Sequence, residues 1–94
     1  MNKIATAALN FYEKSEQYQY LLSRVGIDKS NIQRIGDCVD REQIKLISPS
    51  ETVIVAVFLY AFDWSSVADE ICPKFFSLFQ TCGYEPIFDI LSFN

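Results

Sequence analysis

The chain has 94 residues, half of them hydrophobic and 15% aromatic, with eight Lys and Arg against twelve Asp and Glu. This composition predicts one folded domain over 1–94 and excludes an intrinsically disordered chain. The absence of histidine excludes Ser-His and Cys-His nucleophile pairs and histidine zinc sites. The three cysteines form no C-x-x-C pair, which is typical of reduced, mostly buried thiols in an intracellular chain: Cys38, Cys72 and Cys82.

The net charge of −4 is unevenly distributed along the chain. Residues 1–46 carry seven Lys and Arg against six Asp and Glu, whereas residues 47–94 carry only Lys74 against six Asp and Glu. An acidic half argues against nucleic-acid and anionic-membrane partners, because both attract clustered cations. Two interpretations of the acidic half stay open: a solubilising face, and a surface that docks onto a basic protein.

The sequence contains no pattern that predicts a membrane span or a signal peptide. The longest apolar run, Val53–Phe62, has ten residues, about half of the ~20 that a membrane-spanning helix needs. Near the N-terminus, Asn10 and the charged residues after it interrupt a short Ala-rich stretch. We therefore expect a cytoplasmic protein.

The first segment, residues 2–25, is predicted to be one helix. Its apolar residues recur at alternating spacings of four and three, with a single polar break at Ser15, and Gly26 stands where a residue that closes a helix belongs. A coiled-coil seam is the alternative interpretation of this stripe.

Two shorter elements are expected next. Residues 31–36 are a candidate strand with two isoleucines as its apolar anchors. Asp37 and Asp40 are candidate N-caps for a short helix over residues 41–47.

Segment 52–62 carries two conflicting patterns. Ser48-Pro49-Ser50-Glu51 is a capping box with proline at the first helical position, which predicts a helix. The segment is also rich in β-branched residues and has no polar face, which favours a strand covered on both sides. We expect a strand, because a helix that is apolar all round needs burial on every side, which a small domain supplies with difficulty.

The last elements complete a β-α-β unit, which crosses over right-handed to give parallel strands. A helix is expected over residues 65–82, kinked by Pro73 and ended by Gly83. After Pro86, a strand is expected over residues 87–93.

The stretch Phe58-Leu59-Tyr60-Ala61-Phe62-Asp63-Trp64, with Pro73 nine residues after Trp64, resembles the active-site strand, tryptophan and helix-kinking proline of thioredoxin-like domains. The resemblance covers residues 31–93. It implies an α/β fold, a thioredoxin-like β-α-β-α-β core with an added N-terminal helix over residues 1–26. An all-α bundle is the alternative fold.

The same resemblance implies a redox-inactive core. Ser65 and Ala68 stand where the family has the two cysteines of its Cys-x-x-Cys, and neither side chain performs thiol–disulfide exchange. The family's cis-proline, its two later strands and its closing helix have no counterpart. Without those strands the edge of strand 52–62 would need a cover: the N-terminal helix, a second copy or another protein.

The candidate partner-binding residues follow from this strand. Tyr60, Phe62 and Trp64 alternate, so on a strand they would point to one side, and Ser65 and Ser66 come directly after them. The alternative is that the three aromatic residues close the end of the core.

No catalytic residue, metal site or cofactor is expected. The serine pair has no base, the three glycines are isolated and form no phosphate loop, and the nearby carboxylates are interpreted as helix N-terminal charge rather than cation ligands: Asp63, Asp69 and Glu70.

The sequence thus predicts a non-catalytic protein–protein interaction module whose partner is another protein or a second copy. Two other hypotheses stay open. One is a small acidic inhibitor of the antitoxin, immunity or phage counter-defence type. The other is a residual thiol enzyme that uses Cys72 or Cys82.

Overall fold

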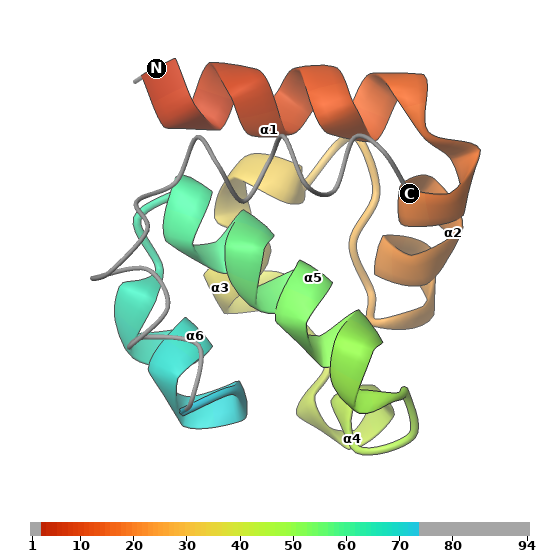
Figure 1. The fold of residues 1–94 in the computed structure, drawn as a ribbon, viewed down its shortest axis with the longest axis vertical. Helices are drawn as coiled ribbons and strands as arrows, with labels where there is room; N and C mark the ends of the chain where they lie inside the picture. The colour runs from red at the N-terminus through yellow and green to blue at the C-terminus, as the bar shows by residue number, and fades with distance from the viewer. Residues whose placement is uncertain (1–2, 74–94) are drawn as a thin grey trace.

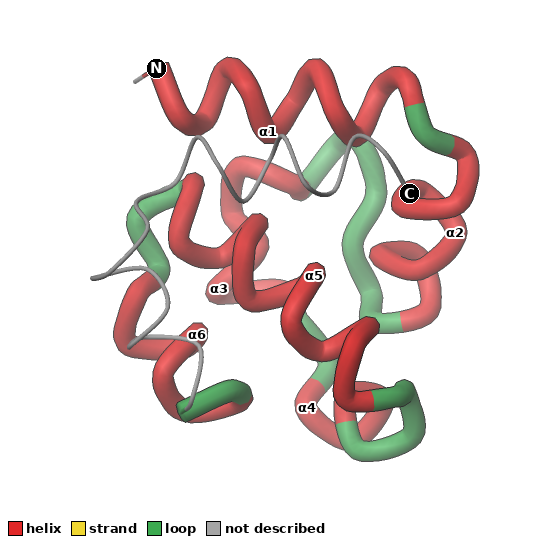
Figure 2. The backbone as a smooth tube through the Cα atoms, viewed as in Figure 1, coloured by secondary structure: helices red, strands yellow, loops and turns green. Residues whose placement is uncertain are grey.

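The computed structural model describes residues 3–73, and these residues form short helices without a strand (Figures 1 and 2). The α/β thioredoxin-like core expected above is therefore wrong, and the all-α bundle named as the alternative agrees with the structure. The elements in chain order are α1 (Lys3–Lys14), α2 (Glu16–Arg24), the 3-10 helix η1 (Ile32–Arg34), α3 (Ile35–Cys38), α4 (Arg41–Ile44), α5 (Pro49–Ala61) and α6 (Ser65–Ile71).

Helix α5 occupies the segment that was expected to be a strand. The capping box forms: the Ser48 hydroxyl accepts from the Glu51 N–H at 3.2 Å, and Glu51 Oε1 accepts from the Ser48 N–H at 2.9 Å. Pro49 lies at the start of the helix, where its missing N–H costs nothing. β-Branching lowers helix propensity by only about 0.5 kcal/mol per residue, so it does not outweigh a good cap together with extensive burial.

The burial that an all-apolar helix requires comes from several neighbours at once. Helices α1, α3 and α6 pack against α5, which runs through the centre of the view in Figure 1. From α2, the Tyr18 ring meets Phe58 edge-on with centroids 6.4 Å apart. The seven consecutive residues from Val55 to Ala61 are all buried as a result. Four short helices therefore bury this apolar segment, which was expected to be a strand covered on both sides.

The single helix expected over residues 2–25 is two helices, and the chain turns between them (Figure 1). Ser15 has an extended backbone (φ −122°, ψ 107°), and its hydroxyl accepts from the Tyr18 N–H at 3.2 Å, so it caps α2. The Gln19 side chain donates to the Tyr12 carbonyl at 2.8 Å, which satisfies an acceptor at the end of α1. The polar break in the apolar stripe is thus a corner, and a continuous coiled-coil seam is excluded.

The two short elements in the middle of the chain divide into one error and one confirmation. Residues 31–36 are not a strand but η1 followed by the start of α3. Ile32 and Ile35 are three apart, and both are buried, as residues on one helical face are. The short helix expected over 41–47 is confirmed over α4, which ends at Ile44, and Asp40 caps it by accepting from two backbone N–H groups at 3.0 and 3.3 Å. The other candidate cap, Asp37, lies inside α3.

Helix α6 begins at Ser65 as expected but ends at Ile71, before Pro73. Proline therefore follows this helix rather than kinking it, in agreement with the steric restriction that proline places on the residue before it. The expected continuation to residue 82, the stop at Gly83 and the strand over 87–93 lie outside the described residues.

Helix α2 ends in a Schellman motif, as the position of Gly26 predicts. Gly26 has φ +90°, its N–H donates to the Ser23 carbonyl at 3.2 Å, and the Ile27 N–H donates to the Leu22 carbonyl at 2.8 Å. Glycine is needed here for a second reason: an added Cβ would lie 3.1 Å from the Cys38 carbonyl oxygen.

Helix α5 ends in the same motif with an aspartate in the left-handed position. Asp63 has φ +68°, its N–H donates to the Tyr60 carbonyl at 3.1 Å, and the Trp64 N–H donates to the Leu59 carbonyl at 2.8 Å. An L-residue in this conformation costs about 1–2 kcal/mol, and aspartate tolerates it better than most.

We expect Asp63→Gly to raise the free energy of unfolding by about 0.5–1 kcal/mol. Glycine removes the left-handed penalty but loses about 0.5–1 kcal/mol through greater freedom in the unfolded chain. Urea denaturation followed by circular dichroism measures the difference. Asp63→Ala, which keeps the Cβ, is the matched control and gains nothing. A glycine variant that unfolds at lower urea than the wild type would contradict the left-handed cap.

Candidate functional site

The five residues predicted to bind a partner differ in their exposure in the structure. Tyr60 and Phe62 are buried, Trp64 is half-buried, and Ser65 and Ser66 are exposed in the first turn of α6. Alternation places side chains on one side of a strand, but residues two apart on a helix do not share a face. The aromatic residues therefore do not form one exposed anchor.

Trp64 packs against the backbone of α3. A Cβ added to Gly36 would lie 2.0 Å from Trp64 Cδ2 and 2.2 Å from Cε3, so the indole ring takes the space that any larger residue would need. This contact joins the corner between α5 and α6 to α3, which is buried at Gly36.

The carboxylates of α6 also turn toward the rest of the molecule. The Tyr60 hydroxyl donates to Asp69, and Arg41 donates to Glu70 Oε2 from Nε at 2.9 Å and from Nη2 at 2.7 Å. These contacts hold α6 against α5 and against the N-terminus of α4. Between residues 3 and 73, no group of acidic and cysteine side chains is arranged to hold a metal ion.

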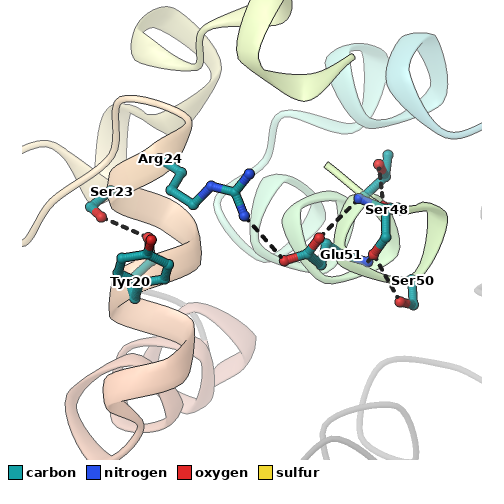
Figure 3. A network of polar contacts seen from close by, with 7 residues as sticks. Tyr20, Ser23, Arg24, Ser48, Ser50 and Glu51 are labelled. Atoms are coloured by element: carbon teal, nitrogen blue, oxygen red, sulfur yellow. Dashed lines mark hydrogen bonds and ion pairs between the residues drawn. The ribbon is translucent and has the colours of Figure 1, made fainter. Parts of the chain in front are cut away.

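A second polar network joins α2 to the N-terminus of α5 (Figure 3). Arg24 Nη1 lies 3.7 Å from Glu51 Oε2, while the other oxygen of that carboxylate accepts from the Ser48 N–H. Glu51 therefore serves two contacts: it closes the capping box and it ties α5 to α2. The capping-box pattern predicts the first contact, and no local pattern indicates the second.

These contacts lower the pKa of Glu51 below its ordinary value of 4.5. The Ser48 backbone N–H contributes most, the Ser48 hydroxyl next, and Arg24 adds a smaller electrostatic effect. Each of these groups favours the charged carboxylate, so each contributes more to the stability of the folded chain when Glu51 is ionised than when it is protonated.

We expect Glu51→Gln to flatten the acid limb of the stability curve. A lowered folded-state pKa contributes stability that is fully present above the unfolded-state value of 4.5 and is lost as the pH falls through the folded-state pKa. Urea unfolding between about pH 6 and about pH 3 measures this loss, which is smaller in the variant than in the wild type. Arg24→Gln is the control: it keeps most of the pH dependence, since the two Ser48 contacts dominate. Parallel curves for wild type and Glu51→Gln would contradict this assignment.

Two large hydrophobic side chains near this network are exposed. Tyr20 is 68% exposed and Leu46 is 69% exposed. Tyr20 lies one turn before Arg24 on α2, so the two share a face of the helix (Figure 3). Leu46 lies two residues before Ser48, in the turn that leads into α5. We call the residues Tyr20, Arg24, Leu46, Ser48 and Glu51 the α2–α5 surface.

Sequence patterns gave weak signals for this surface. Tyr20 falls outside the apolar stripe of α2, and a residue outside the stripe of a helix is expected to face solvent. Leu46 falls within the short helix expected over residues 41–47, so its exposure in a turn is not predicted. In the structure α4 ends at Ile44, before Leu46. Arg24 and Glu51 come from different elements, and no local pattern pairs them.

Of the cysteines, Cys38 and Cys72 are half-buried, and Cys82 lies outside the described residues. None of the helices between residues 3 and 73 is both long enough and apolar enough to cross a membrane.

Comparisons of this chain with protein-family models, with curated proteins and with solved structures found no match. No family is therefore assigned. The resemblance to thioredoxin-like domains has lost its structural basis, because the stretch that carried it is the second half of helix α5 and the corner after it.

Proposed function

We propose that this chain is a non-catalytic helical module that binds another protein through the α2–α5 surface. The supporting observation is the exposure of two large hydrophobic side chains near the Arg24–Glu51 ion pair in the chain: Tyr20, one turn before Arg24 on α2, and Leu46, in the turn that leads into α5. Tyrosine and arginine are enriched among the residues that dominate binding energy at interfaces. An aromatic ring one helical turn from an ion-paired guanidinium supplies both an apolar contact and directed hydrogen-bond donors.

The backbone beneath the α2 part of this surface is held in place before any partner arrives. Arg24 contacts Glu51, and the Ser23 hydroxyl donates to the Tyr20 carbonyl at 2.6 Å (Figure 3). Beneath it, Leu22 of α2 is fully buried in the same core as α5. A preorganised surface loses little conformational entropy on binding, which favours affinity.

The acidic-inhibitor hypothesis depends on carboxylates that face a basic partner. Glu51, Asp69 and Glu70 each contact a side chain of their own chain, namely Arg24, Tyr60 and Arg41. The two arginines offset the charge of Glu51 and Glu70, and the Tyr60 hydroxyl occupies one oxygen of Asp69. The apolar part of the α2–α5 surface therefore supports the interaction proposal better than the acidic half does.

Photo-crosslinking tests the surface directly. A photoreactive amino acid is placed at position 20 or 46 in the full chain, with position 10, exposed on α1, as the matched control. We expect positions 20 and 46 to yield the same protein adduct in the native cell and position 10 to yield none. Absence of an adduct, or the same products from all three positions, would overturn the proposal.

We expect Tyr20→Glu and Leu46→Glu each to lower the affinity for the crosslinked protein at least tenfold. A carboxylate in the apolar part of an interface loses its water without gaining an opposite charge, which weakens binding. Substitutions at exposed positions change the stability of the free chain by only about 0.5 kcal/mol. Titration of the purified partner measures affinity, and circular dichroism checks the fold. Asn10→Glu is the control and binds as the wild type does. Unchanged affinity in both surface variants would contradict the assigned surface.

A further inference from the structure

We draw no further inference here: the strongest candidate, the exposed apolar pair Tyr20 and Leu46 on the α2–α5 surface, belongs to the site already described, and nothing in the structure shows what covers it.

Discussion

Gly36→Ala is expected to destabilise the protein by about 1–3 kcal/mol, the usual range for overpacking a core. The new methyl group would lie 2.0–2.4 Å from three ring atoms of Trp64, well inside van der Waals contact. The sign is informative, because alanine in a helix is otherwise about 1 kcal/mol more favourable than glycine. Urea unfolding, followed by the fluorescence of this single tryptophan and by circular dichroism, measures the effect.

The matched background for this test is Trp64→Ala. Without the indole, Gly36→Ala meets no obstacle and is expected to be neutral or stabilising, so a double-mutant cycle gives a coupling energy of opposite sign to the single effect. Circular dichroism is the readout in that background, since the tryptophan is gone. Equal destabilisation by Gly36→Ala with and without Trp64 would mean that the indole does not occupy this space.

Phe58→Ala is expected to cost about 3–5 kcal/mol, the range for removing a buried phenylalanine ring. Phe58 is fully buried near the middle of α5, and its ring is met edge-on by Tyr18. Small domains have about 5–15 kcal/mol of stability in total, so this one change removes a large share of it. Chemical denaturation at a fixed temperature provides the number.

Val53→Ala is the control within the same helix. Val53 is half-buried and lies in the first part of α5, so its truncation removes fewer contacts and is expected to cost less than half as much as Phe58→Ala. If the two substitutions cost the same, α5 does not present Phe58 to the centre of the core.

The local patterns of the sequence predicted helix ends well. The capping box at Ser48, the N-cap at Asp40 and the closing glycine at position 26 all occur as expected, because each depends on backbone groups within a few residues. The start of α6 at Ser65 belongs to the same group. Such patterns indicate where a helix begins or ends. The capping box was right even for segment 52–62, for which the predicted strand is wrong.

The strand prediction over residues 52–62 is wrong because β-branching and uniform apolarity do not outweigh the helix cap. Both patterns report how much of a segment is buried, and neither says what buries it. Here the cover consists of other short helices, such as α1, which lies far earlier in the chain, and α6, which comes directly after α5. The alternation of Tyr60, Phe62 and Trp64 would place the three side chains on one side of a strand, but it does not do so where the chain is helical.

The contacts that position α6 and the α2–α5 surface were beyond sequence reasoning for a different reason. Arg41 and Glu70 are 29 residues apart, and Arg24 and Glu51 belong to different helices. The charge counts show an excess of acidic residues in the second half of the chain. They do not show that carboxylates of this half contact arginines of the first half. These ion pairs depend on how helix α5 packs against its neighbours, and a strand over the same residues predicts none of that packing.

The central place of α5 also bears on how the chain is made. During synthesis the residues before Pro49 emerge from the ribosome before α5 does. Leu22 and Ile35, which share one hydrophobic cluster with α5, then lack that part of the cluster, and the Tyr18 ring lacks its contact with Phe58. We expect the nascent chain to stay open until Ala61 has emerged and then to collapse around the new helix. A ribosome stalled just before α5 would hold an aggregation-prone intermediate of the kind that chaperones bind.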